Sequence, residues 1–148
     1  MVDIGIKTPM KRRAKSQGRI IVGEEILRRI QGQGKMKKGD ILTVSKVAGI
    51  MGAKHTSQLI PLCHQIPLDN IYIDIESCVD TKSLVVTAEV RAIHKTGVEM
   101  ESLMAVTITL LTLYDMCKSV EKSMSITDIR LVSKEKVSDQ VGPASEMN

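Results

Sequence analysis

The chain has 148 residues, which is enough for one domain with a buried core. Its apolar share of 43% and charged share of 26% are ordinary for a soluble globular protein. The longest uncharged apolar stretch, Ser102 to Tyr114, is too short to cross a membrane, and no signal peptide precedes it. Three scattered cysteines, Cys63, Cys78 and Cys117, form no disulfide framework, so we expect a cytoplasmic protein.

The net charge is +4, and much of it lies early in the chain. Six Lys and Arg residues and no acid occur between Ile4 and Gly23. A solvated arm over residues 1–13 is the commoner explanation of such a run. The alternative is an arm that closes over an anionic ligand, because guanidinium groups pair well with phosphate oxygens. Composition alone does not choose between the two.

The first half of the chain predicts a strand followed by two helices. The strand is expected over Ala14–Val22 and ends in three β-branched residues. A short helix follows over Glu24–Gln31, with acids in its first turn and arginines in its last. Asp40 is a plausible N-cap for a second helix that ends near Met51 or Ala53. An irregular loop then lies between Pro61 and Pro67.

The second half predicts a hairpin, a long helix and a final strand. Alternating apolar residues define the two hairpin strands: Ile71, Ile73 and Ile75, then Leu84, Val86, Ala88 and Val90. A polar turn near Asp80–Ser83 joins them. The helix is expected over Val98–Val120 and the last strand over Ile126–Lys134, before a loose polar tail over 138–148. The order β-α-α-β-β-α-β predicts a single catalytic domain over 1–148, an α+β ferredoxin-like sandwich with helices on one face of an antiparallel sheet.

The long helix is apolar around almost its whole circumference. A surface helix of a monomer needs only one apolar stripe. We therefore expect this helix to pack against the sheet and also against another subunit. A monomer with Thr107, Thr109 and Thr112 facing water is the alternative.

Three clusters carry side chains suited to chemistry. Leu62-Cys63-His64 lies in the proline-bracketed loop, and no second pair of ligands follows it at zinc spacing. Glu99 and Glu101 begin the long helix, where carboxylates either complement the dipole or hold a polar substrate. Asp115 and Lys118 are neighbours on one helix face. Such a pair is commonly an exposed ion pair, but on an apolar helix we expect partial burial and a lowered lysine pKa.

Taken in order, these motifs resemble the cyclic pyranopterin monophosphate synthase family, molybdenum cofactor biosynthesis protein C. The resemblance runs from Met1 to about Lys134, and it is carried by six segments: 1–4, 38–40, 48–50, 59–64, 95–101 and 113–118. Gln65, His55 and Ser57 depart from the family pattern.

The resemblance implies a ferredoxin-like subunit in a hexamer built from dimers, with active sites between subunits. It implies conversion of 3′,8-cyclo-7,8-dihydro-GTP to a pyranopterin with a cyclic monophosphate and release of diphosphate. Asp115 and Lys118 match the family's catalytic pair. The positions that match substrate-contacting or phosphate-holding residues are Arg12, Lys38, Lys54, Leu62, Cys63, His64, Glu99, Met100, Glu101 and Lys134. The chemistry involves no redox change, so we expect no nicotinamide or flavin cofactor, and the sequence shows no dedicated metal site.

Two other classes of protein remain as alternatives. Basic domains of this topology often bind RNA by stacking bases on exposed sheet aromatics. Only Tyr72 and Tyr114 are present here, and the second lies in the long helix, so we expect no nucleic acid partner. A ligand-binding protein that has lost activity is the other alternative, and the intact Asp115–Lys118 pair argues against it.

Overall fold

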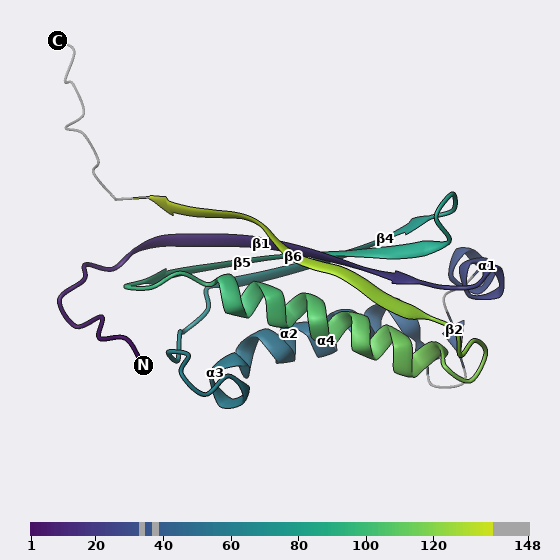
Figure 1. Ribbon diagram of the computed structural model, residues 1–148, viewed down its shortest axis with the longest axis horizontal. Coiled ribbons are helices and arrows are strands. Elements are labelled where there is room, and N and C mark those ends of the chain that lie inside the picture. The colour runs from purple at the N-terminus through teal and green to yellow at the C-terminus, as the bar shows by residue number, and fades with distance from the viewer. Residues whose placement is uncertain (33–34, 37–38, 138–148) are drawn as a thin grey trace, which may run out of the picture.

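The computed structural model describes residues 1–32, 35–36 and 39–137. A four-stranded antiparallel sheet carries its helices on one face (Figure 1). The strands, in the spatial order β4-β5-β1-β6, are β1 (Met10–Ile21), β4 (Asn70–Cys78), β5 (Ser83–His94) and β6 (Ser125–Val137). The second layer is formed by α2 (Ile41–Lys54) and α4 (Glu99–Cys117), and α1 (Glu24–Gly32) lies at one end of the sheet. The predicted ferredoxin-like sandwich is therefore confirmed.

Several element bounds differ from the predicted ones. Strand β1 begins at Met10 rather than Ala14, and β6 runs to Val137 rather than Lys134. Both extensions have one cause, because the added residues pair with each other, Lys11 opposite Val137. The long helix is shorter than expected at both ends. Three small elements were not predicted: α3 (Thr56–Leu59), β2 (Lys35–Met36) and β3 (Gly39–Asp40). The predicted tail over 138–148 lies outside the described residues.

The core lies between the sheet and the helices, where the alternation of the strands places apolar side chains. Leu84, Val86, Ala88 and Val90 of β5 are each at most 1% exposed. Ile73 of β4 is buried, and Ile71 and Ile75 pack against the same core. Successive strand residues point to opposite faces, so this pattern fixes which face the helices cover. The predicted inward sets of the hairpin are confirmed.

Helix α2 begins where the sequence predicts. The Asp40 side chain accepts a hydrogen bond from the Thr43 backbone N–H at 3.0 Å, which is the geometry of an N-cap. Further along α2, Gly49 and Gly52 allow close contact with α4. A Cβ at Gly49 would lie 2.6 Å from Ile73 Cδ1 and 2.9 Å from the Ala105 carbonyl oxygen. These glycines therefore set how closely the two helices approach.

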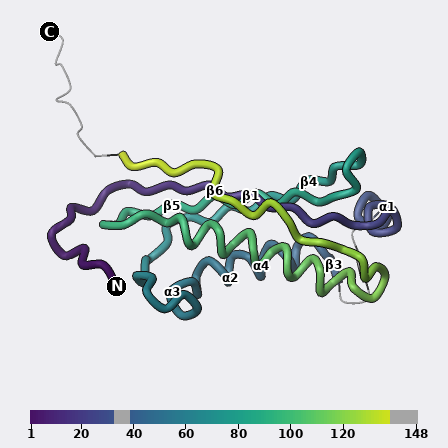
Figure 2. Tube along the Cα trace, in the orientation of Figure 1, coloured from purple at the N-terminus to yellow at the C-terminus, as the bar shows by residue number. Residues whose placement is uncertain are grey.

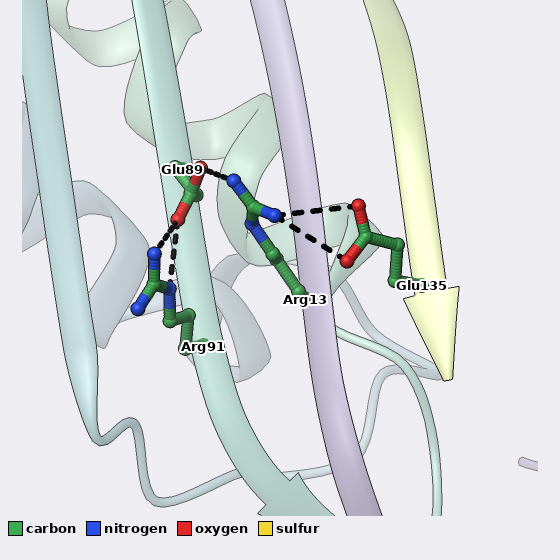
Figure 3. Close-up of polar contacts among 4 residues, drawn as sticks. All are labelled: Arg13, Glu89, Arg91 and Glu135. Atoms are coloured by element: carbon green, nitrogen blue, oxygen red, sulfur yellow. Dashed lines mark hydrogen bonds and ion pairs between the residues drawn. The ribbon is translucent and has the colours of Figure 1, made fainter. Parts of the chain in front are cut away.

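The face of the sheet away from the helices carries a cross-strand ion cluster (Figure 3). Arg13 of β1 binds Glu89 of β5 at 2.6 Å and Glu135 of β6 at 3.3 Å, and Arg91 binds Glu89 at 2.6 Å. The cluster joins three strands at one end of the sheet. Because neighbouring residues of a strand point to opposite faces, holding Arg13 on this face directs Arg12 toward the helices.

Helix α4 is long and apolar enough, by length and composition, to be a candidate membrane span. In the folded chain, half of that segment is buried against other elements. Ala105, Val106, Leu110 and Leu113 are fully buried on its sheet side. This is the environment of a core helix of a sandwich.

Candidate active site

Three neighbouring clefts surround the first turn of α4. The first has a volume of about 260 Å³ and contains Lys54, Ser57 and Gln65 at its walls. The second, about 320 Å³, is lined by Leu62, Cys63, His64, Met100 and both glutamates. The third, about 230 Å³, is basic and is lined by Arg12, Lys134 and Lys136 with Glu99. Glu101 is shared by the first two clefts and Glu99 by the last two.

The loop between α3 and β4 forms one wall of the second cleft, because it passes beside the start of α4 (Figure 2). The backbone N–H of Cys63 donates to the Ile60 carbonyl at 3.2 Å, which turns the chain after α3. Cys63 and His64 thereby face the glutamates of α4 across one cavity. The predicted loop between Pro61 and Pro67 positions these side chains.

Glu101 is the most deeply placed acid of this site. It is only 3% exposed, and its Oε2 atom has no hydrogen-bond partner among the described residues. Its other oxygen, Oε1, lies 3.8 Å from the Cys63 thiol, which can donate to it. Burial raises the pKa of the Glu101 carboxyl, and repulsion from Glu99 raises it further. A carboxyl group in this state is suited to bind a donor or to move a proton.

Glu99 connects the acidic cleft to the basic one. Its carboxylate lies 3.2 Å from the ammonium group of Lys134 on β6. A Cβ at Gly97 would collide with the same carboxylate, so glycine at this position makes room for it. The position explains why a glycine comes just before the two acids.

Arg12 closes the basic cleft from the sheet side. Its guanidinium donates to the carbonyl oxygens of His94 at 3.1 Å and Lys95 at 3.0 Å. Burial lowers the pKa of His94, as do the nearby His64, Arg12 and Lys95, so His94 is neutral near pH 7. Lys95 in turn donates to the Gly5 carbonyl at 2.7 Å, which holds the N-terminal segment beside this loop.

Asp115 and Lys118 lie at the other end of α4. The pair is formed at 2.7 Å, as the helical spacing predicts. The expected burial and lowered lysine pKa are wrong for the single chain, because both side chains are about half exposed and the Asp115 carboxylate raises the pKa of Lys118. The pair sits on the outward face of α4, away from the sheet, where water still solvates both charges.

The structure therefore divides the predicted site residues into two groups. It gathers nine of them around the start of α4: Arg12, Lys54, Leu62, Cys63, His64, Glu99, Met100, Glu101 and Lys134. It places Asp115 and Lys118 near the opposite end of the helix. The remaining one, Lys38, lies outside the described residues.

Some residues that line the clefts were not predicted as site residues. Thr56, Ser57 and Gln65 line the first cleft, and Thr96 and Gly97 the second. His94, which belongs to no recognisable metal or triad motif, stands beside Arg12 and Lys95. The sequence indicates His94 only through its position at the end of a strand, shortly before Glu99 and Glu101.

Fold and site together define a class: a ferredoxin-like α+β protein in which a buried carboxyl group lines a cleft, with basic side chains in the two neighbouring clefts. The chain belongs to the MoaC family, whose model matches residues 1–137. It is 51% identical over 134 residues to a cyclic pyranopterin monophosphate synthase of Listeria welshimeri, covering 90% of this chain and 82% of the relative. A protein of that name from Clostridium botulinum is 49% identical, covering 90% of this chain and 84% of the relative. The molybdenum cofactor biosynthesis protein 1 of Drosophila melanogaster is 45% identical over 90% of this chain and 24% of its own length.

Proposed function

We propose that this protein is a cyclic pyranopterin monophosphate synthase of molybdenum cofactor biosynthesis, a lyase. Its substrate in this proposal is 3′,8-cyclo-7,8-dihydro-GTP, which rearranges to the pyranopterin while a cyclic monophosphate closes and diphosphate leaves. The observation that carries the proposal is the pair of acids at the start of α4: the buried Glu101 lines the cleft with Lys54, and Glu99 lines the cleft with Arg12 and Lys134. The names of the relatives agree with it.

The clefts suit the two halves of such a substrate. Carboxylates accept hydrogen bonds, so Glu99 and Glu101 can hold the amidine edge of a purine or pterin ring. The phosphate oxygens need cations, which Arg12, Lys134 and Lys54 supply from the two flanking clefts. Fixed cations also stabilise the charge that develops on a departing diphosphate.

Ring opening and closure need an acid and a base, and we assign these roles to Asp115 and Lys118. They cannot reach the same rings as Glu101 within one chain. Fourteen residues separate Glu101 from Asp115, which is about 21 Å along a helix. A complete site therefore needs Asp115 and Lys118 from a second copy of the chain.

The outward surface of the helical layer supports such an assembly. Apolar side chains lie exposed on it, with Val47 at 52% and Met51 at 54% on α2 and Leu111 at 55% on α4. Met100, Met104, Leu111 and Asp115 follow one face of α4 at helical spacing. A two-fold contact along that face would run the helices antiparallel and bring Asp115 of one subunit toward the first turn of the other. It would also remove water from the Asp115–Lys118 pair. We expect such dimers to build a hexamer.

The same proposal places the enzyme in the cytoplasm, with no cofactor and with neither nucleic acid nor membrane as a partner. The RNA-binding alternative finds no support among the relatives, which carry the names of biosynthetic proteins.

The direct test is incubation with the cyclised GTP substrate, followed by mass spectrometry of the products. We expect cyclic pyranopterin monophosphate and one diphosphate per turnover. Unchanged substrate, with an active relative converting it in parallel, would exclude the proposal.

A further inference from the structure

The contact between Cys63 and Glu101 links the loop after α3 to the first turn of α4. The Cys63 Sγ atom lies 3.8 Å from Glu101 Oε1, within reach of a thiol hydrogen bond. The two residues are 38 positions apart in the sequence, so the fold creates this contact. Cys63 is partly buried beside the carboxyl group.

The thiol acts as the donor of this bond. Burial raises the pKa of Cys63, and the Glu101 carboxylate raises it further. The sulfur therefore keeps its proton near neutral pH. A protonated thiol can donate a hydrogen bond to a carboxylate oxygen. An ionised carboxylate has no proton and can only accept.

The two oxygens of Glu101 are consequently not equivalent. Oε1 has the Cys63 donor, whereas Oε2 is buried and has no partner among the described residues. A buried carboxylate oxygen without a donor is costly, and such groups are normally satisfied. In a cleft that accepts a ligand, the ligand can supply the missing donor.

We propose that Cys63 is a positioning residue for Glu101: its S–H group holds Oε1 and leaves Oε2 as the oxygen that accepts a hydrogen bond from the substrate. The family resemblance includes Cys63 among the substrate-contacting positions, whereas in this proposal its side chain acts through Glu101. The identity of the substrate here rests on the proposed function. The geometry rests on the contact between Cys63 and Glu101 alone.

Four titratable side chains share a cleft with the Glu101 carboxyl: Glu99 of α4, Cys63 and His64 of the loop, and Lys54 of α2. Of these, Glu99 and Cys63 shift the Glu101 pKa, and a hydrogen bond from the Glu101 backbone lowers it. The Cys63 bond lowers the Glu101 pKa, against burial and Glu99, which raise it. Loss of the thiol donor therefore leaves the carboxyl harder to ionise.

The test compares Cys63→Ala, which removes the donor, with Cys63→Ser, which keeps one, and with Cys78→Ala, a cysteine far from the site. We expect the acid limb of the kcat/KM profile to move to higher pH in Cys63→Ala, with kcat/KM at neutral pH reduced about tenfold. Cys63→Ser should restore much of the loss, and Cys78→Ala should match the wild type. An unmoved limb in a folded Cys63→Ala protein would overturn the proposal.

Two further measurements separate positioning from direct contact. Combined with Glu101→Gln, the Cys63→Ala change should add no further loss, because its effect passes through the carboxylate. Additive losses would mean that Cys63 acts on the substrate independently, contrary to the proposal. Carbon-13 NMR titration of the Glu101 carboxyl needs no substrate, and it should show a higher pKa in Cys63→Ala. If the wild type makes no pyranopterin, the function fails, and this titration still decides the role of Cys63.

Discussion

Glu101 is a carboxyl group that the fold keeps buried at the wall of a cleft, away from bulk water. Ionising it is unfavourable in the folded chain, since burial disfavours the charged form. The folded protein therefore binds a proton more tightly at this position than the unfolded chain does. This difference in proton binding lowers the free energy of unfolding as pH rises. The loss begins near the ordinary pKa of the carboxyl, 4.5, and continues through its raised pKa in the folded protein.

From this linkage between proton binding and stability we predict that Glu101→Gln stabilises the fold at neutral pH while it lowers activity to a residual level. The amide is neutral at every pH, so its advantage over the wild type should be small near pH 4.5 and grow as pH rises through the raised pKa of the folded protein. Urea denaturation at several pH values measures it. A matched change, Glu135→Gln on the far side of the sheet, should show no such growth, because that side chain is half exposed to water. A Glu101→Gln protein less stable than the wild type throughout this range contradicts the prediction.

At the other end of α4, we predict that Asp115→Asn and Lys118→Ala leave a folded protein whose turnover is reduced by about two to four orders of magnitude. Circular dichroism and light scattering check that each variant stays folded and oligomeric. Lys122→Ala, a nearby exposed lysine, is the control and should retain activity. Near-normal turnover in either folded variant would remove the pair from the catalytic roles.

At the scale of elements, the contact between α2 and α4 depends on two glycines of α2. We predict that Gly49→Ala lowers the free energy of unfolding by roughly 1–3 kcal/mol, because the added methyl meets Ile73 and the Ala105 backbone. Gly32→Ala is the matched control, since a Cβ there has no neighbour within 4 Å. Chemical denaturation of both variants measures the difference. Equal stability of the two would show that α2 can move away from α4 without cost.

The elements also show what the sequence can and cannot predict. The alternation of Ile71, Ile73 and Ile75 predicts a strand and its inward face, because half-buried strands require that period. The ends of β1 and β6 were missed, since they are stabilised by pairing between residues more than a hundred positions apart. Helix α3 is four residues long and has no apolar period to reveal it. Local pattern thus predicts elements, and long-range pairing decides where they end.

The same division applies to the site. Motif resemblance predicts Glu99, Glu101 and His64 together, and the fold brings them to one cleft. It does not predict the contact of Cys63 with Glu101, which depends on how a loop packs on a helix. The charge state of Lys118 was predicted from the apolar composition of α4 as a whole. Lys118 lies instead on the outward face of α4, where water and Asp115 favour its ammonium form.

At the scale of the whole molecule, the proposed function divides the site between the two ends of α4. The first turn of α4 has Glu99, Glu101 and the clefts around them, and the last turn has the Asp115–Lys118 pair. The outward stripe of α4 joins the two ends with exposed apolar side chains, which a second copy would cover. Light scattering should therefore show an oligomer, and a stable 16.3 kDa monomer at micromolar concentration would contradict this.

The sharing of the site predicts that two inactive variants rescue each other. Asp115→Asn and Glu101→Ala are each expected to be inactive alone, since every site lacks one half. In oligomers that mix the two variants at random, half of the sites have an intact Glu101 and half have an intact Asp115. The two occur independently, so a quarter of the sites have both. Co-expression should then restore about a quarter of wild-type activity. Mixing is verified by native mass spectrometry, and the control pair, Asp115→Asn with Lys118→Ala, should restore none, because both changes fall in the same half. If mixed oligomers form and activity stays at the level of the separate variants, each site is built within one chain and the two-fold arrangement is wrong.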